Sequence, residues 1–335
     1  MKAETVVDRI VLDRGAYKVL ERQRADRAAG EGDEASRTPL RWHGLVDKFA
    51  RERMGNAIAP FQFASLWDPK QILFAWHVTS AALWGANSGR LVYLYWGAAQ
   101  SGTMHRLALR RVLTCARLVL VNDEVAGQEV QALVGRQAHR LPMFIDAGFF
   151  KYGSLRHRQD FIFCAGSNDR NPEILVALAH RGYSVVWLVN DPSLVAQYGD
   201  VSGNLKIVSA ISYAELLRLY QTCRVAVMPS LRDIHAAGQT TGLEALACGA
   251  PLLISAGRTA TIFSHLPTVR VIDSASTEAW VEALGSIELL AETSFVESAR
   301  WVGKHVNAHT IMDRLASLLD ESARNGGADV LSGAG

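Results

Sequence analysis

Short apolar runs alternate with amphipathic segments along most of the chain, a pattern typical of parallel strands joined by helices. In the first half, apolar runs predict strands at 72–76, 91–96, 118–121 and 140–145, and helices at 80–84, 105–115 and 125–134. Such alternation favours a parallel sheet with helices on both faces. Before residue 70 the pattern is less regular, and the polar segment 28–39 predicts a mobile loop.

The alternation restarts after residues 151–159, which are basic, poor in apolar side chains and typical of an interdomain linker. The second half has predicted strands at 161–164, 185–189, 205–208, 225–228, 252–254 and 269–272, and helices at 172–180, 213–221, 276–290 and 295–319. We therefore predict an α/β protein with two doubly wound, Rossmann-like domains that face a cleft. The predicted domains are 1–155 and 156–320, with a flexible tail at 321–335; the last helix can pack back on the first domain.

One stretch of the second half carries the strongest chemical signal. The apolar run 224–229 enters it as a buried strand, and the small, polar residues 238–241 predict a loop. A helix is expected from about Gly242, with Gly249 ending it before the strand 251–255. Backbone N–H groups in a loop that leads into a helix N-terminus form an anion-binding site. On these residues alone, Thr241 and Glu244 also fit a capping box that would only close the helix.

The wider string extends from Pro229-Ser230 through Ala237-Gly238 to Leu243-Glu244-Ala245-x-Ala247-x-Gly249-x-Pro251. It resembles the second domain of nucleotide-sugar glycosyltransferases of the GT-B class, retaining branch (glycosyltransferase family 4-like, group 1). The resemblance covers roughly residues 70–320. It implies the GT-B fold, with acceptor binding in the N-terminal domain and donor binding in the C-terminal domain.

The resemblance implies that loop amides hold the donor diphosphate and that Glu244 holds the ribose. The implied donor-binding residues are Gly166, Arg170, Ile211, His235, Gly238, Gln239, Thr240, Thr241 and Glu244. A guanidinium at Arg170 can bind two phosphate oxygens and offset the charge of a leaving nucleoside diphosphate. Arg170 could instead be a surface residue paired with Asp169 or Glu173.

Two positions depart from the family pattern. Ala236 stands eight positions before Glu244, where many retaining members carry an acidic residue against the donor sugar. His235 or Asp233 could substitute for it. Trp96 stands where the family often has histidine, which removes a familiar donor contact.

Candidate catalytic residues are Arg170, Glu244, His77 and Asp123. His77 ends a predicted strand, where it could bind a sugar hydroxyl or the acceptor, or be a structural histidine near a core tryptophan. Asp123 could contact the acceptor or cap the helix that follows it. No His/Cys cluster indicates a metal site, so we expect neither a metal nor a cofactor.

The resemblance implies a hexosyltransferase-like enzyme of polysaccharide or glycoconjugate biosynthesis. It would move a sugar from a UDP- or GDP-linked donor to an acceptor hydroxyl, with retention and without metal. In that mechanism the departing phosphate helps to deprotonate the acceptor. The alternatives are a nucleotide-sugar epimerase on the same fold and a non-catalytic nucleotide-sugar-binding subunit.

The net charge of +2 is unevenly placed. Residues 1–158 hold 23 Lys and Arg against 15 Asp and Glu, a net +8, whereas residues 159–335 hold 12 against 18, a net −6. A basic surface favours anionic partners, although surplus arginine can also be ordinary solvated surface. The predicted helix 105–115 carries Arg106, Arg110 and Arg111 beside Leu107, Leu109 and Leu113. This pattern suits an anionic membrane surface, but it is more often an ordinary sheet-packing helix.

The chain begins with a polar segment and has no apolar run long enough to span a membrane. Its four cysteines, Cys115, Cys164, Cys223 and Cys248, are far apart in apolar contexts, which predicts buried thiols of a reducing compartment. We therefore expect a cytoplasmic protein, in peripheral contact with the inner face of the membrane through its basic N-terminal domain. The acceptor could be a glycan, a lipid-linked sugar or a small molecule, and no nucleic acid is expected.

Overall fold

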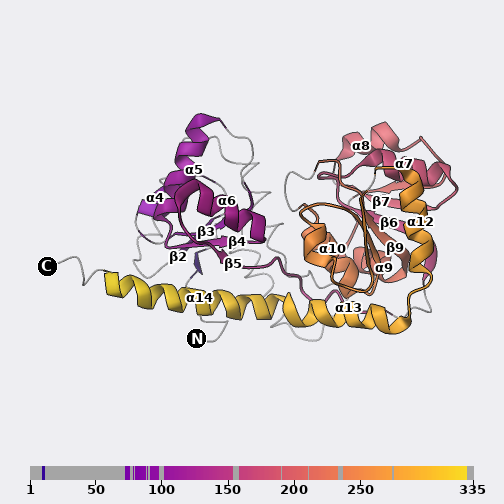
Figure 1. The fold of residues 1–335 in the computed structure, drawn as a ribbon. Helices are drawn as coiled ribbons and strands as arrows, with labels where there is room; N and C mark the ends of the chain where they lie inside the picture. The colour runs from indigo at the N-terminus through magenta and orange to yellow at the C-terminus, as the bar shows by residue number, and fades with distance from the viewer. Residues whose placement is uncertain are drawn as a thin grey trace. The chain divides into compact units, whose positions relative to one another are not determined.

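The computed structural model describes residues 10–11, 72–75 and most of 78–329, apart from gaps at 79, 88, 90, 98–101, 154–157, 190, 210, 233–236 and 274. The described residues form two compact units. Of these residues, one unit contains 10–11, those between 72 and 142, and 308–329, and the other contains those between 143 and 307. Both are built from parallel strands and helices (Figure 1), which confirms the predicted α/β class.

The sheet of the first unit has the strand order β1-β2-β3-β4-β5, and all neighbours are parallel. Its strands are β1 (Ile10–Val11), β2 (Ile72–Ala75), β3 (Leu91–Tyr95), β4 (Leu118–Val121) and β5 (His139–Arg140). Strands β3 and β4 are buried along their whole length, as expected for continuous apolar runs in a parallel sheet.

The helices of the first unit are α4 (Ser80–Asn87), α5 (Thr103–Cys115), α6 (Glu124–Val134) and α14 (Ala308–Asp329). Helix α5 places Leu109, Val112 and Leu113 in the core of this unit. Helix α6 ends at Gly135, whose φ of 68° is the left-handed conformation that glycine adopts at low cost.

The sheet of the second unit has the order β11-β10-β9-β6-β7-β8, again parallel throughout. Its strands are β6 (Gln159–Ala165), β7 (Val185–Leu188), β8 (Leu205–Val208), β9 (Cys223–Met228), β10 (Leu252–Ser255) and β11 (Val269–Ile272). From β6 the chain adds β7 and β8 on one side and then returns to place β9 on the other. The strand order therefore reverses between β6 and β9.

The helices of the second unit are α7 (Pro172–His180), α8 (Pro192–Tyr198), α9 (Tyr213–Thr222), α10 (Gln239–Ala247), α11 (Ala260–Phe263), α12 (Thr277–Ile287) and α13 (Glu292–His305). Helices α7 and α12 pack around Trp187 and Trp280 in one core cluster. Helix α10 packs against α9 and α13. None of the described helices in either unit is long and apolar enough to cross a membrane.

Two predicted elements differ in the structure. The strand expected at 140–145 is reduced to His139–Arg140, and Ile145 forms only an isolated β-bridge with Asn307. The strand does not continue because Pro142 has no N–H to donate to a neighbouring strand. The single helix expected at 295–319 is two helices. It breaks at Val306 and Asn307 because Ile145 donates its N–H to the Val306 carbonyl and pairs with Asn307.

The ends of the predicted domains also differ from the units observed. Residues 143–153, expected in the first domain, belong to the second unit, whereas helix α14 belongs to the first unit, as the predicted packing of the last helix on the first domain allows. This helix continues to Asp329, through much of the segment expected to be a flexible tail.

Candidate functional site

The reversal of strand order between β6 and β9 places two predicted segments at one edge of the sheet. The loop that carries Arg170 follows β6, and helix α10 comes after β9. Parallel sheets of this kind bind ligands at the carboxyl ends of strands where the order reverses. The segments after the two strands are hydrogen-bonded to each other. Asn171 donates its N–H to the Pro229 carbonyl at 2.8 Å, and the backbones of Arg170 and Ser230 form an isolated antiparallel β-bridge.

Helix α10 begins at Gln239, so the loop predicted at 238–241 is mostly the first helical turn. Its N-cap is Gly238, with a φ of 88°. The first intrahelical hydrogen bond runs from the Gly242 N–H to the Gly238 carbonyl at 2.9 Å. The backbone N–H groups of residues 239–241 come before that first donor, so they have no acceptor within the helix. Such N–H groups at a helix N-terminus can bind an anion.

Glycine at position 238 allows two side chains to approach the backbone closely. A Cβ there would lie 2.4 Å from Met228 Cε and 2.7 Å from Arg170 Nη2. Such separations are shorter than any ordinary contact, and the left-handed φ would strain another residue as well. Gly238 therefore brings the Arg170 guanidinium close to the backbone where α10 begins.

The capping-box interpretation of Thr241 and Glu244 is wrong. Thr241 lies inside the first turn, and its hydroxyl donates to the Gly238 carbonyl at 2.8 Å. The same oxygen accepts a hydrogen bond from Arg170 Nη2 at 3.1 Å. Thr241 thus connects the helix N-terminus to Arg170, and Glu244 lies one turn further along.

Arg170 is buried, with 5% of its surface exposed. Its Nε and Nη2 donate to the Ala165 carbonyl at 3.3 and 3.1 Å, and its Nη1 donates to the Asn168 carbonyl at 3.2 Å. With the bond to Thr241, four of the five guanidinium N–H groups have an acceptor, and within the described residues one N–H on Nη1 has none.

The surface-pair interpretation of Arg170 is also wrong. Asp169 instead accepts the backbone N–H of Arg232 at 2.9 Å. Among the described residues no carboxylate forms an ion pair with Arg170. The thiol of Cys164 does not supply a negative charge, because burial raises its pKa to about 11, although Arg170 acts in the opposite direction. A buried cation without a counter-charge is costly, and an anionic ligand would relieve that cost.

Glu244 is fully buried, with 0% of its surface exposed. Its Oε2 accepts a hydrogen bond from the Tyr220 hydroxyl at 3.3 Å, and Tyr220 packs edge-on against Phe163 at 5.1 Å. Sequence reasoning did not identify Tyr220 as the partner of this carboxylate. The available signal was the apolar face of α9, where Leu216, Leu219 and Tyr220 are buried together.

The remaining donor candidates surround the same edge of the sheet. Gly166 has a φ of 89°, and its carbonyl accepts a hydrogen bond from Trp187 Nε1 at 2.9 Å. Gln239 is 4% exposed, and its amide nitrogen has no partner among the described residues. Thr240 and Ile211 are half-buried, with Ile211 directly before the N-cap of α9.

Two candidates, His77 and His235, lie outside the described residues, as do Asp233 and Ala236. Asp123 is 3% exposed and accepts the Ala126 N–H at 2.8 Å, so its interpretation as the N-cap of α6 is confirmed.

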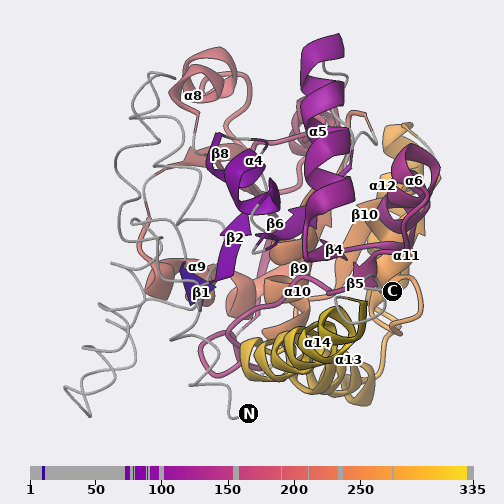
Figure 2. The same cartoon turned by 90° about the vertical axis from the view of Figure 1, so that its left-hand side faces the viewer.

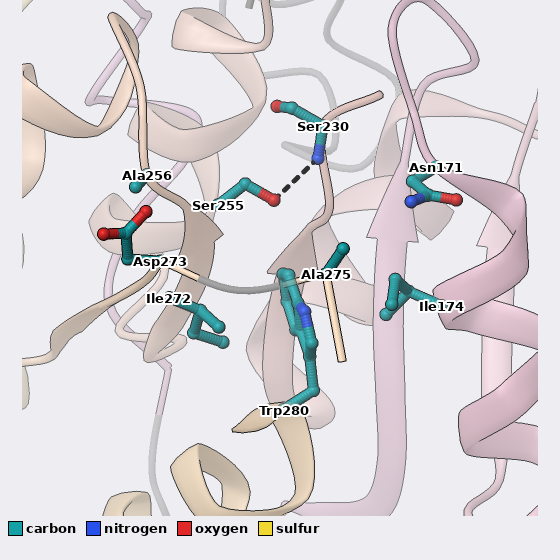
Figure 3. A pocket seen from close by; sticks show the side chains of 9 residues that line it. All are labelled: Asn171, Ile174, Ser230, Ser255, Ala256, Ile272, Asp273, Ala275 and Trp280. Carbon is teal, nitrogen blue, oxygen red and sulfur yellow. Dashed lines mark hydrogen bonds between the residues drawn. The ribbon is translucent and has the colours of Figure 1, made fainter. Parts of the chain in front are cut away.

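A cavity of about 310 Å³ lies beside this site (Figure 3). Its lining side chains come from the carboxyl ends of β9, β10 and β11 and from the start of α7 and α12: Asn171, Ile174, Ser230, Ser255, Ala256, Ile272, Asp273, Ala275 and Trp280. Across it, the Ser230 N–H donates to Ser255 Oγ at 2.9 Å. None of the predicted donor-binding residues lines it, so the cavity and the Arg170 site are separate features joined through Asn171 and Ser230.

Within the described ranges, no group of three or more His, Cys, Asp or Glu side chains could hold a metal ion.

No family model matches the sequence, and no curated protein is similar enough in sequence to count as a match. Solved structures do match the fold. Anabaena HepE in complex with UDP and glucose has a TM-score of 0.63 and 14% identity, over 79% of this chain and 81% of HepE. Sucrose-phosphate synthase from Thermosynechococcus elongatus has a TM-score of 0.61 and 16% identity, over 79% and 76% of the two chains.

An α,α-trehalose 6-phosphate synthase from Burkholderia multivorans matches with a TM-score of 0.60 and 12% identity, over 81% of this chain and 76% of that one. These neighbours are GT-B glycosyltransferases. The fold of this protein is therefore GT-B, with two Rossmann-like parallel-sheet units. At these identities the likeness establishes the fold alone.

Proposed function

We propose that this protein is a glycosyltransferase that moves a sugar from a nucleoside diphosphate sugar to an acceptor hydroxyl. The observation that carries this proposal is the buried guanidinium of Arg170 at the N-terminus of α10, which has no carboxylate partner among the described residues. A diphosphate matches this site in charge. The N–H groups of the first helical turn and the remaining Nη1 N–H of Arg170 can all donate to its oxygens.

The neighbouring residues fit the rest of a donor. Glu244 lies one turn along α10, and we assign its carboxylate to the ribose hydroxyls, with Tyr220 fixing its orientation. The half-buried Ile211 would contact the base through its backbone. HepE, which shares the fold, was crystallised with UDP and glucose, which favours a uridine diphosphate sugar as the donor. A guanosine diphosphate sugar is the other donor that we propose to test.

We further propose transfer with retention and without metal. The bond between the donor anomeric carbon and the phosphate oxygen breaks, and the acceptor oxygen bonds to that carbon on the same face. The acceptor proton goes to the departing phosphate oxygen, and the nucleoside diphosphate leaves. Arg170, Thr241 and the helix dipole offset the charge that develops on the phosphate. We assign acceptor binding to the first unit, where His77 and Asp123 remain candidates.

The test is a thermal-unfolding panel with UDP, GDP, ADP and TDP and their common sugars. A ligand present at a hundred times its dissociation constant adds about 2.7 kcal/mol of stability. We expect one nucleoside diphosphate to stabilise the wild type and to lose that effect in Glu244→Gln. The matched control is Glu173→Gln, which changes an exposed carboxylate of α7.

Turnover decides between the enzyme and its alternatives. The nucleotide sugar that stabilises the protein is incubated with candidate acceptors, and products are analysed by mass spectrometry and NMR. A new glycosidic linkage supports transfer, whereas an epimerised nucleotide sugar without an acceptor product indicates the epimerase. Stabilisation without turnover on any acceptor indicates a binding subunit, and no stabilisation by any nucleotide contradicts the donor site itself.

A further inference from the structure

The cavity beside Trp280 contains a buried hydrogen-bond donor that is not satisfied. Trp280 lines this cavity and is 0% exposed, yet its indole Nε1 has no hydrogen-bond partner among the described residues. Buried polar groups in folded proteins nearly always have a partner, because a buried donor without one costs stability. In Figure 3 the indole stands between the side chains of Ile272 and Ile174. The cavity therefore suits a ligand that accepts a hydrogen bond from this indole.

The size of the cavity agrees with a small ligand. Its volume of about 310 Å³ is far larger than the space of about 10–15 Å³ that one water requires. A single bridging water therefore does not fill it. Pockets for small molecules range from about 300 to 1,000 Å³, so this cavity lies at the lower end of that range.

The cavity lies on the other face of the second sheet from α10. Side chains alternate between the two faces of a strand. In β9, Met228 faces the start of α10, where a Cβ at Gly238 would lie 2.4 Å from its Cε. Val227 faces the other way and belongs to the core cluster that contains Trp280. Helix α12, which carries Trp280, packs against α7, β10 and β11, whereas α10 packs against α9 and α13 (Figures 1 and 2). The cavity is thus a second place at the edge of this sheet.

Neutral donors lie on one side of the cavity and a carboxylate on the other. The Asn171 side-chain oxygen caps α7, and its amide nitrogen is directed toward the cavity in Figure 3. Ser255 Oγ accepts the Ser230 N–H at 2.9 Å, and its own O–H can donate. Asp273 stands on the opposite side in Figure 3, and within the described ranges its carboxylate forms no ion pair.

These groups restrict the class of ligand. None of the described residues that line the cavity is Lys, Arg or His, and Asp273 would repel a phosphate or carboxylate. A cation would pair with Asp273 but could not accept the N–H of Trp280. Hydroxyl groups both donate and accept, so a neutral molecule with several hydroxyls satisfies the two sides together.

We propose that this cavity binds an uncharged sugar of one pyranose ring, at a site separate from the donor site. Trp280 Nε1 and the Asn171 amide would donate to sugar hydroxyls, and a neighbouring pair of hydroxyls would donate to the Asp273 carboxylate. The carbon atoms of the ring would contact Ile174 and Ile272. This inference goes beyond the proposed function and does not rest on it.

The test is a titration of the full chain, without nucleotide, with glucose, galactose, mannose and N-acetylglucosamine. The indole N–H signals of the eight tryptophans are followed by NMR after ¹⁵N labelling, and Trp280→Phe identifies the signal of Trp280. We expect one sugar to move that signal to higher frequency, because the N–H gains an acceptor. The dissociation constant should be about millimolar, as is usual for a ligand of about twelve non-hydrogen atoms.

Two variants test the lining without touching the core. Asp273→Asn changes an exposed side chain and should weaken the sugar about tenfold, because it removes the charge from the acceptor. Ala275→Leu should abolish binding, because the larger side chain occupies the cavity. The matched control Asp200→Asn changes an exposed carboxylate elsewhere in this unit and should bind like the wild type. The signal of Trp301, on α13, should stay in place throughout.

Four results would overturn the proposal. The Trp280 signal could stay in place with all four sugars, or its shift could persist in Asp273→Asn and Ala275→Leu. A shift caused by inorganic phosphate and not by sugars would show that the cavity takes an anion. Displacement of the bound sugar by a nucleoside diphosphate would show that the cavity is part of the donor site.

Thermal stabilisation by nucleotides, measured on the same protein, separates this proposal from the proposed function. Sugar binding at Trp280 without stabilisation by any nucleotide contradicts the donor site and leaves the sugar site intact. Stabilisation by a nucleotide without a sugar-dependent shift at Trp280 contradicts the sugar site alone.

Discussion

Helices α5 and α10 both begin after a glycine, but the two glycines differ in conformation, with φ of −57° at Gly102 and 88° at Gly238, and the two helix ends differ in their surroundings. Each follows a glycine N-cap, Gly102 or Gly238, with no side-chain cap and no acidic residue in its first turn. Around α10 the neighbouring loops supply a buried guanidinium from Arg170, whereas the first turns of α5 are exposed. An uncapped helix end is thus a candidate diphosphate site in one unit, where a buried cation lies beside it, and an exposed helix end in the other. The comparison teaches that the neighbours of a helix end decide which ligand it suits.

The largest expected difference between the two helices is in cysteine reactivity. Cys115 ends α5 and is half-exposed, whereas Cys248 caps the end of α10 and is 1% exposed. Burial raises the pKa of Cys248 well above its usual range, and Glu244 adds to this effect. The reactive thiolate is therefore suppressed at neutral pH, and access requires opening of the core.

We expect Cys115 to be alkylated on the order of a thousandfold faster than Cys248, as measured by peptide mass spectrometry in a time course, because core positions open rarely. Unfolding in urea provides the control, since both cysteines should then react at similar rates. Similar rates in the native protein would show that α10 frays, which contradicts a rigid, buried anion site.

Gly238→Ala tests the close approach at the start of α10. The left-handed conformation costs about 1–2 kcal/mol, and the steric overlap with Met228 and Arg170 adds about 1–3 kcal/mol. We expect the free energy of unfolding, measured in urea, to fall by about 2–5 kcal/mol. Gly203→Ala is the matched control, because nothing lies within 4 Å of its added Cβ, and its effect should stay within about 0.5 kcal/mol. Equal effects at the two glycines would contradict the tight fit.

Much of the fold could be predicted because it depends on local pattern. Strands such as Leu118–Val121 are continuous apolar runs, and their burial follows directly. The start of α10 could not be predicted from the sequence, because residues 238–241 are small and polar and look like a loop. They join the helix through Gly238 in the left-handed conformation and the Thr241 hydroxyl on the Gly238 carbonyl.

Contacts between distant residues explain the other differences. The break between α13 and α14 depends on bonds from Ile145, which the local sequence does not reveal. A charged residue such as Arg170 also looks exposed in sequence, yet the carbonyls of Ala165 and Asn168 allow its burial. The resemblance directed attention to this segment, but Tyr220 as the partner of Glu244 became clear only from the packing of α9 on α10.

Arg170→Lys should weaken donor binding by about ten- to a hundredfold. Lysine keeps the charge but loses the planar fork, and hydrogen bonds to charged groups contribute about 1.5–3 kcal/mol. Isothermal titration with the stabilising nucleoside diphosphate measures the change. Arg181→Lys, at an exposed ion pair with Glu278, should bind like the wild type. An unchanged affinity in Arg170→Lys would show that the diphosphate binds elsewhere.

Tyr220→Phe should have the smallest effect. It removes the tyrosine hydroxyl that donates to the Glu244 carboxylate, and this loss should lower the free energy of unfolding by about 0.5–1.5 kcal/mol. If Tyr220 orients Glu244 toward a ribose, donor affinity should fall as well. Tyr183→Phe, at a half-buried tyrosine packed against the core, serves as the control. Full donor affinity with reduced stability would assign Tyr220 to the fold alone.

The most direct test of the central claim is a crystal structure with the nucleoside diphosphate that stabilises the protein most. Our account predicts that its β-phosphate lies within hydrogen-bond distance of the Arg170 guanidinium and of backbone N–H groups in the first turn of α10, with the ribose at Glu244. A nucleotide bound elsewhere, for example in the cavity beside Trp280, would contradict the assignment of α10 as the donor site.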